Sequence, residues 1–235
     1  VSCRLTGLTG SGLGEQLDSE DLGELETVFQ QDCAELIQRH GGCPPQYMGS
    51  GMLACFGCNQ VREDDSERAV HAGLHLVRNL PAALRRKLPY LPSTLAVSVG
   101  IQTDRVALQD VSLDPRERTL APHGEAPSMA AWLSRQAGPG EVVIGETTWR
   151  LVRGGFVSEP IGTRVFDGLA GSVRMPVHRV LRERPAATRI EQALAAGGLT
   201  PLVGRKRELN RLLELWEWAR RGQGASVLLR GEAGI

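Results

Sequence analysis

The sequence predicts an α+β fold, with α/β as the alternative, in which helices cover one mixed sheet. Segments with alternating or continuous apolar residues, typical of strands, are interleaved with segments whose apolar residues recur every three or four positions, typical of helices. In the first half of the chain these segments follow the order βαββαβ, and further αβ units come after them.

The first half of the chain supplies the predicted βαββαβ unit. Residues 1–8 alternate as a strand does, and "TGSGLG" after them is a turn. Asp18-Ser19-Glu20 caps a helix whose apolar repeat ends at Gly41-Gly42. "QYMGSGMLACFG", residues 46–57, predicts a hairpin with the three-residue tip Gly49-Ser50-Gly51. A helix over 62–84, acidic in its first turn, precedes a long strand or bent strand pair over 93–108.

The second half continues with shorter elements and then changes in composition. Residues 118–123 predict a strand, 126–137 a helix, 140–146 a buried strand, 147–156 a short helix, and 159–181 two strands around a glycine turn. From Arg182 the chain becomes rich in Ala, Gly and Pro. We therefore expect one domain over 1–182, a linker over 183–200, and a fragment of a second domain over 201–235.

The last segment has the order of elements that opens a P-loop domain. An amphipathic helix and a glycine loop precede the apolar run "ASVLLR", for which we expect a buried strand. Gly231, Glu232, Ala233 and Gly234 then match the start of G-x-x-x-x-G-K-[ST], which predicts a truncated nucleotide-binding loop. An ordinary glycine-rich turn is the alternative. Without the Lys and Ser/Thr, this chain cannot itself be a competent ATPase.

Composition disfavours several classes of function. Lys+Arg and Asp+Glu both number 27, so no net charge marks a nucleic-acid-binding surface. No apolar run reaches the roughly 18 residues of a membrane span, and no secretory signal opens the chain. Five cysteines, an odd number, indicate reduced thiols. We therefore expect a soluble cytoplasmic protein that binds neither membrane nor nucleic acid.

Two spacings raise the possibility of a metal or redox site. Cys55 and Cys58 are three apart, as in a metal knuckle or redox pair, but no second cysteine pair follows. Because residues three apart on a strand point to opposite faces, we interpret them as core cysteines. His71 and His75 share one helical face without the acidic partner of a zinc helix, so we expect no metal there.

Five segments of residues 1–182 resemble, in the same order, the class III adenylate/guanylate cyclase homology domain. They are "LTGLTGSG", "IQRHGGCPPQYMGSGMLACFG", "DDSERAVHAGLHL", "LAVSVGIQTDRV" and "PSMAAWLSRQAGPGEVVIGETTWRLV". The resemblance implies a ferredoxin-like βαββαβ core of the nucleotide cyclase type. "LVGRKREL", before the predicted P-loop, resembles the entry segment of AAA-like ATPases of the signalling type.

The cyclase resemblance implies a reaction that converts a nucleoside triphosphate into a cyclic 3′,5′-monophosphate and pyrophosphate. Two carboxylates hold two metal ions, a Lys and an Asp or Thr contact the purine, and an Asn and an Arg stabilise the transition state across a dimer interface. None of these residue types is present at the matching positions. The metal positions carry Gly7 and Ser50, the purine positions Gln46 and Ala121, and the transition-state positions Ser128 and Trp132.

These replacements predict that the fold is kept and catalysis is lost. A glycine and one neutral hydroxyl cannot neutralise two divalent cations, and the Trp132 ring would tend to fill the triphosphate groove. Other nearby carboxylates, Glu125, Asp104 and Asp110, show no pair spaced for a two-metal site.

The leading hypothesis is therefore a degenerate cyclase homology domain that serves as a regulatory or dimerisation module in signal transduction. Its expected partners are a second cyclase-type domain, in a homodimer or an intramolecular pair, and a downstream P-loop ATPase. We expect no cofactor in the cyclase-like domain, and ATP with Mg only in a full-length P-loop domain. The alternatives are an active cyclase with unconventional ligands, and a structural front end of a STAND-type ATPase switch.

Overall fold

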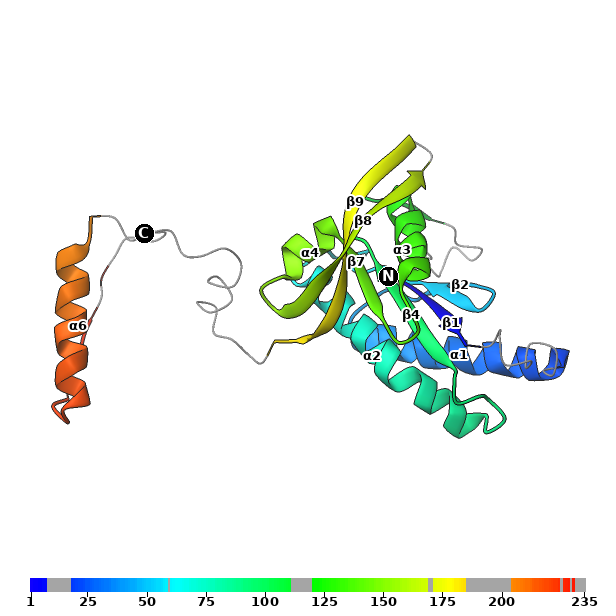
Figure 1. Ribbon diagram of the computed structural model, residues 1–235, viewed down its shortest axis with the longest axis horizontal. Coiled ribbons are helices and arrows are strands. Elements are labelled where there is room, and N and C mark those ends of the chain that lie inside the picture. Colours follow the sequence, from blue (N-terminus) through cyan, green and yellow to red (C-terminus); the bar gives the residue numbers. More distant parts are fainter. Residues whose placement is uncertain are drawn as a thin grey trace. The chain divides into compact units, whose positions relative to one another are not determined.

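The chain divides into two units, Val1–Ala196 and Gly197–Ile235, and each is described by itself. The computed structural model describes residues 1–7, 18–58, 60–110, 120–168, 171–184, 204–224, 226–228 and 230 (Figure 1). Most of the predicted linker and the predicted P-loop residues Gly231, Glu232, Ala233 and Gly234 lie outside these described residues.

The first unit is built on a seven-stranded sheet. Its strands lie in the order β2 (Gln46–Met48), β3 (Gly51–Leu53), β1 (Ser2–Thr6), β4 (Ala96–Ile101), β7 (Val142–Gly145), β9 (Gly171–Glu183) and β8 (Phe156–Gly168). The described β4–β7 pair is parallel and the other pairs are antiparallel, so the sheet is mixed. Helices α1 (Ser19–Arg39) and α2 (Asp65–Lys87) connect its first strands. The order β2-β3-β1-β4 confirms the predicted ferredoxin-like βαββαβ core.

The second half of the unit adds two helices and a separate ribbon. The predicted strand over 93–108 is two strands, β4 and β5 (Ala107–Asp110), in different sheets. β5 pairs with β6 (Leu120–His123), and α3 (Glu125–Gln136) and α4 (Glu146–Val152) flank β7. The α+β prediction with a mixed sheet is thus confirmed.

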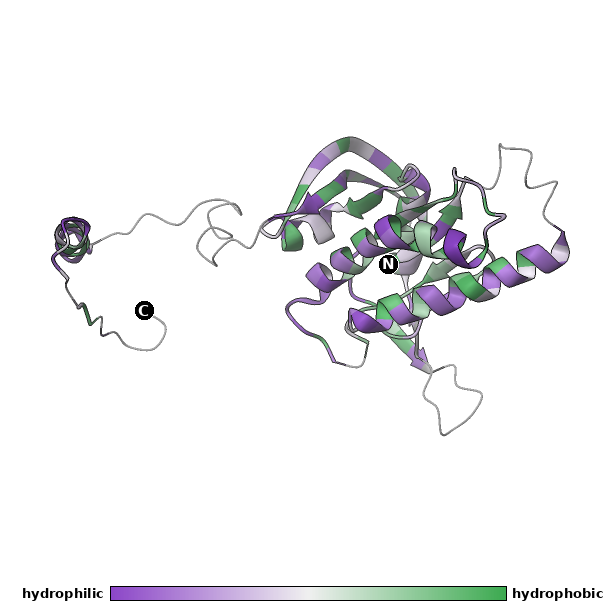
Figure 2. Cartoon of the chain, turned by 90° about the horizontal axis from the view of Figure 1, so that it is seen from below, coloured by the Kyte–Doolittle hydropathy of each residue, from purple (hydrophilic) through white to green (hydrophobic). Residues whose placement is uncertain are grey.

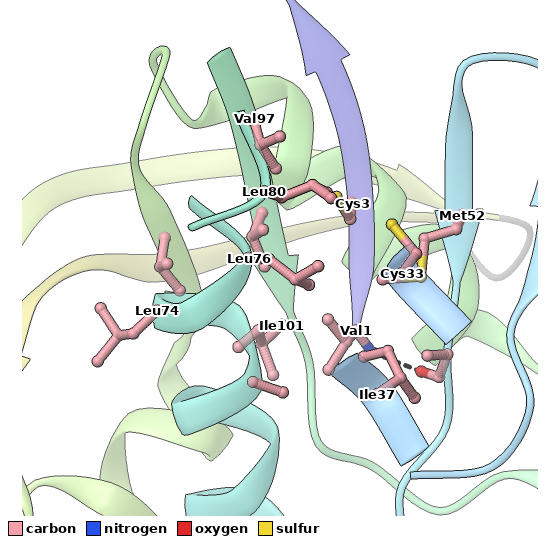
Figure 3. Packing of buried hydrophobic residues seen from close by; sticks show 14 of the residues in the cluster. Val1, Cys3, Cys33, Ile37, Met52, Leu74, Leu76, Leu80, Val97 and Ile101 are labelled. Carbon is pink, nitrogen blue, oxygen red and sulfur yellow. Dashed lines mark hydrogen bonds between the residues drawn. The ribbon is translucent and has the colours of Figure 1, made fainter. Parts of the chain in front are cut away.

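Strand residues alternate between two cores, one on each face of the sheet. Val142 and Ile144 of β7 face the larger core, under α1, α2 and α4, whereas Val143 between them faces the smaller core under α3. Figure 3 shows the larger core, where Cys3 of β1 and Val97 of β4 lie among side chains from both long helices. Figure 2 shows the matching mixture of hydrophilic and hydrophobic residues along α1 and α2.

The α3 face of the central strands is made of small and polar residues. Ser2 Oγ lies 3.5 Å from Ser134 Oγ, and Arg4 Nε donates to the Ser134 carbonyl at 3.1 Å. A Cβ atom on Gly100 would lie 2.2 Å from the Ser134 nitrogen and 2.3 Å from the Ala130 carbonyl oxygen. The missing side chain of Gly100 therefore lets α3 lie directly on β4.

Local signals explain where α1 begins and how the hairpin turns. The Asp18 carboxylate accepts hydrogen bonds from the Glu20 and Asp21 backbone N–H groups at 2.9 Å, as the predicted cap requires. The hairpin tip has two residues, Gly49 and Ser50, and the predicted third tip residue, Gly51, already pairs with Met48. Because Gly49 has φ +55°, a two-residue turn matching the strand twist is accessible.

The long strands β8 and β9 pair with each other and form one edge of the sheet. Each strand has 13 residues, and their register shifts between Val157 and Ser158 and again between Pro160 and Thr163. Pro160 is exposed on β8, the strand at one edge of the described sheet. Pairing of two strands around a glycine turn, predicted over 159–181, is confirmed over a longer range.

The second unit contains α6 (Lys206–Arg220) in its described part. The amphipathic helix is confirmed, but Trp216 is 63% exposed and α6 buries none of its residues. The predicted buried strand over "ASVLLR" is wrong for residues 226–228, which form no strand, and Leu228 is 80% exposed. A strand needs a paired neighbour, and the described residues of this unit supply none. No described helix is long and apolar enough to cross a membrane.

Candidate functional site

The two positions that match the metal carboxylates lie at the same end of the central strands. β1 pairs with β3 so that Arg4 lies opposite Gly51, and the Leu5 N–H continues this ladder by donating to the Ser50 carbonyl at 3.0 Å. Gly7 follows β1 directly, two residues beyond Leu5. The structure therefore brings Gly7 and Ser50 together, as the resemblance implies.

The backbone at Gly7 leaves no room for a side chain. Its φ is +82°, and a Cβ atom built there would lie 2.1 Å from the Thr94 carbonyl oxygen. The Thr94 hydroxyl also donates to the Gly7 carbonyl at 3.1 Å, which holds the two segments together. No L-residue fits this position without a shift of the 94–95 backbone.

The purine-matching positions lie on two different sheets. Gln46 begins β2 and pairs with Leu53, away from the tip that carries Ser50. Ala121 lies in β6 opposite Gln109, in the two-stranded ribbon. The chain fold thus places Ala121 outside the central sheet that carries the other strand positions.

The transition-state-matching positions lie one turn apart on α3. Ser128 is exposed, and Trp132 is partly buried against the smaller core. The Trp132 ring packs edge to face on Phe166 of β8, with ring centroids 5.7 Å apart. The Trp132 ring therefore packs against the sheet through Phe166.

The other carboxylates do not gather at the Gly7 end. Asp104 follows the last residues of β4, whereas Thr94, which contacts Gly7, precedes the first ones. A Cβ atom on Gly168 of β8 would lie 2.6 Å from Glu125 Oε1, which places Glu125 beside β8. Asp110 ends β5, and its side chain is outside the description. Among the described residues, no three His, Cys, Asp or Glu form a group that could hold a metal.

A small pocket lies at the opposite end of β1 from Gly7. Its volume is about 100 Å³, and its lining includes Cys55, Phe56, Asp65, Ser66, Thr103 and Asp104. The hydroxyls of Ser66 and Thr148 lie 3.3 and 3.1 Å from that of Thr103, and so join α2, α4 and the end of β4. Ligand pockets usually enclose about 300–1,000 Å³, so this one is too small for a nucleoside triphosphate.

Three partly buried cysteines, Cys43, Cys55 and Cys58, lie near one another beside this pocket, and the interpretation of Cys55 and Cys58 as core cysteines is wrong. Cys55 and Cys58 lie in irregular chain after β3, where Gly57 at φ +86° turns the backbone. The strand alternation that would place the two side chains on opposite faces has therefore ended, and Cys55 Sγ lies 3.7 Å from the Phe56 carbonyl oxygen. Cys3 and Cys33, in contrast, are buried in the larger core.

The pKa values of Cys55 and Cys58 are shifted in opposite directions. Hydrogen bonding from Cys58 lowers the pKa of Cys55 to about 7. Hydrogen bonding to Cys55, then burial and hydrogen bonding to Cys43, raise the pKa of Cys58. Cys43 is fixed to the same turn, since its N–H donates to the Cys55 carbonyl at 2.8 Å.

Four contacts of histidine side chains were not predicted from the sequence. His75 Nδ1 lies 2.8 Å from Nε2 of His40, the residue that ends α1, while His71 packs edge to face on Phe156. His178 of β9 is buried, lies 3.0 Å from Glu146 Oε2, and stacks on Trp149 of α4 with ring centroids 4.6 Å apart. Hydrogen bonding from His178 lowers the pKa of Glu146. These contacts join residues far apart in sequence, so no local spacing could reveal them.

Comparison with known proteins gives two results. No family model matches the chain. An uncharacterized protein of Rhizobium meliloti (strain 1021) is 31% identical over 219 residues, which are 93% of this chain. The chain spans 20% of the length of that relative.

Solved structures similar to this chain are nucleotide cyclase domains. The adenylyl cyclase CyaB from P. aeruginosa matches with a TM-score of 0.67 and 19% identity, over 78% of this chain and 92% of that one. The guanylate cyclase domain of RhGC from Catenaria anguillulae, in complex with GTP, matches with a TM-score of 0.61 and 16% identity, over 78% and 94%. A further guanylyl cyclase matches with a TM-score of 0.62 and 22% identity, over 76% and 88%. The described sheet and helices thus have the fold of the class III adenylyl and guanylyl cyclase domains.

Proposed function

We propose that the first unit is a catalytically degenerate nucleotide cyclase domain that acts as a regulatory or dimerisation module in signal transduction. The cyclase fold supports a nucleotide cyclase-like signalling module. The loss of catalysis is our own inference, and it rests on the end of β1 rather than on the fold.

The observation that carries the proposal is the closed backbone at Gly7. The family reaction needs two carboxylates as hard oxygen ligands for two divalent ions. Ser50 offers one neutral hydroxyl, and Gly7 offers no side-chain donor at a point where a Cβ atom would lie 2.1 Å from the Thr94 carbonyl oxygen. These residues therefore do not fit a two-metal site.

The remaining exchanged positions support the same conclusion. Loss of one oriented transition-state donor typically lowers the rate by about 10²- to 10³-fold. Ser128 and Trp132 stand where the resemblance implies an Asn and an Arg, and Trp132 is packed on Phe166. The rate losses caused by removing several residues of one active site do not add simply. Here, however, the metal-binding carboxylates and the transition-state donors are missing together.

We propose that the partner of this unit is a second cyclase-type domain, in a homodimer or an intramolecular pair. The guanylyl cyclase domain of the RhoGC fusion protein from Blastocladiella emersonii is described in one similar structure as a non-canonical dimer and in another as a monomer. A unit that keeps the fold can still occupy one half of such a pair and set the conformation of the other half.

We further propose, on the residues alone, that this module is coupled to a downstream P-loop ATPase of the STAND type that uses ATP and Mg. The "LVGRKREL" segment and Gly231, Glu232, Ala233 and Gly234 motivate this assignment. The cyclase-like unit itself would need no cofactor. Its five free thiols suit a cytoplasmic setting.

Calorimetric titration of the chain with ATP and GTP, each with Mg²⁺ or Mn²⁺, tests the inert site. We expect no metal-dependent heat at micromolar nucleotide and no cyclic nucleotide above a blank, with an active cyclase domain as the positive control. Ser50→Asp is the matched variant, because it adds one carboxylate on the exposed tip and leaves Gly7 unchanged. Micromolar, metal-dependent binding by the parent chain would overturn the proposal, and product formation would establish an active cyclase with unconventional ligands.

Sedimentation velocity tests the dimerisation role separately. A concentration-dependent dimer, or association with an added intact cyclase domain, would support it. A chain that stays monomeric and leaves the activity of every intact cyclase domain offered unchanged would refute it.

A further inference from the structure

The cysteine cluster beside the small pocket has no role in the proposed function, although its chemistry is specific. Cys43, Cys55 and Cys58 are all partly exposed, whereas Cys3 and Cys33 have 0% exposure. All five are free thiols. A soluble reagent can therefore reach the cluster while the two core thiols are shielded.

The turn after β3 sets the geometry of the cluster. Gly57, at φ +86°, reverses the chain between Cys55 and Cys58, and a Cβ atom there would lie 2.6 Å from Asp65 Oδ2 at the start of α2. The turn therefore lies against the Asp65 side chain at the start of α2. The Cys43 N–H bond to the Cys55 carbonyl fixes its other side.

We propose that Cys55 and Cys58 are a redox-active dithiol, which small disulfides of the glutathione class oxidise to an intramolecular disulfide. Gly57 reverses the chain between these two partly exposed thiols, so their sulfurs lie on one i, i+3 turn and can meet for exchange. The assignment is independent of the cyclase-like site, which lies at the other end of β1.

The step follows from the difference between the two thiols. The Cys55 thiolate attacks one sulfur of the oxidant R–S–S–R, forms a Cys55–S–S–R mixed disulfide, and expels R–S⁻, which takes up a proton. Cys58 loses its proton, attacks the Cys55 sulfur and expels the second R–S⁻. Two protons and two electrons pass from the dithiol to the oxidant, which becomes two molecules of R–SH.

The roles of attacking and resolving thiol follow from their surroundings. The lowered pKa of Cys55 raises its thiolate fraction at neutral pH, whereas the raised pKa of Cys58 keeps that thiol protonated. Cys43 is held beside Cys55 by its N–H bond to the Cys55 carbonyl, and it is therefore the competing thiol.

The test is mass spectrometry of the intact chain after equilibration in glutathione buffers of increasing oxidation, with alkylation of the remaining thiols. We expect a Cys55–Cys58 disulfide in the parent chain and in Cys43→Ser. Cys58→Ser should accumulate glutathione on Cys55, and Cys55→Ser should gain glutathione at Cys58 at least about tenfold more slowly. Cys3 and Cys33 should resist alkylation until urea is added, which shows within the same sample that each variant is folded.

Three outcomes would overturn the proposal. Cys55 and Cys58 could stay alkylatable in fully oxidised glutathione. The disulfide could join Cys43 to either of them instead. Cys58→Ser could be folded by the Cys3 and Cys33 criterion and still trap no glutathione on Cys55.

Discussion

Replacing Gly7 by alanine places one methyl group against the Thr94 carbonyl oxygen. This variant tests whether the Thr94 backbone excludes every side chain, and so every carboxylate, from position 7. Two costs arise. An L-residue at positive φ costs about 1–2 kcal/mol relative to glycine. Forcing a methyl group into occupied space costs a further 1–3 kcal/mol or so, since the contact is with backbone at 2.1 Å and not with a flexible side chain.

Gly140→Ala is the matched control, because it carries the first cost without the second. Gly140 has φ +79°, close to the +82° of Gly7, but a Cβ atom there would meet nothing within 4 Å. Its N–H bond to the Val97 carbonyl is a backbone bond that alanine keeps. The difference between the two variants therefore isolates the contact with Thr94.

Urea unfolding followed by circular dichroism measures the free energy of unfolding of both variants. Gly7→Ala should lose at least about 1 kcal/mol more than Gly140→Ala. Equal losses would refute the steric argument and would reopen Gly7 as a position that lost its carboxylate by simple exchange. Gly7→Asp would then be expected to fold as well as Gly140→Asp.

Three further predictions rest on other contacts of the first unit. Gly100→Ala should cost about 1–3 kcal/mol in urea unfolding, because α3 backbone atoms occupy the Cβ position, and a change within 0.5 kcal/mol would contradict this packing. Asp18→Ala should cost about 1 kcal/mol by removing the α1 cap, whereas Asp18→Ser should recover most of it. The lowered pKa of Glu146 stabilises the fold above the ordinary pKa of a glutamate, and this stability is lost as pH falls through the folded value. Glu146→Gln should therefore flatten the acid limb of a stability–pH curve, and an unchanged slope below pH 4.5 would argue against the His178 contact.

The order of the helices and strands could be predicted from the sequence because caps and turns depend on residues that are close together in the chain. Asp18 marks the start of α1, and the glycines around Ser50 mark the hairpin tip, whatever the rest of the chain does. The resemblance then located Gly7 and Ser50 as neighbours, and the β1–β3 register agrees. Topology followed once these elements were in order.

Close approaches between distant segments could not be predicted. Nothing near Gly7 in sequence indicates Thr94, and nothing near His75 indicates His40. The interpretation of Cys55 and Cys58 failed for a related reason. It extended strand alternation past the end of β3, and only the backbone angle of Gly57 shows that the alternation has stopped.

The prediction of a buried strand at "ASVLLR" failed because a sequence pattern was taken as sufficient evidence for a buried strand. An apolar run predicts burial only if the fold supplies something to bury it against, and the described residues of the second unit supply neither a pairing strand nor a covering surface for Leu228. Apolar composition alone therefore overstates structure when an element lacks its neighbours.

The irregular register of β8 bears on whether another molecule can pair with this edge of the sheet. An edge strand with a regular row of free N–H and C=O groups invites pairing with another molecule, and so promotes aggregation. β8 interrupts that row with Pro160, which has no N–H to donate, and with two shifts of register against β9. The opposite edge, β2, offers three residues. Both ends of the described sheet thus present poor templates for intermolecular strand addition.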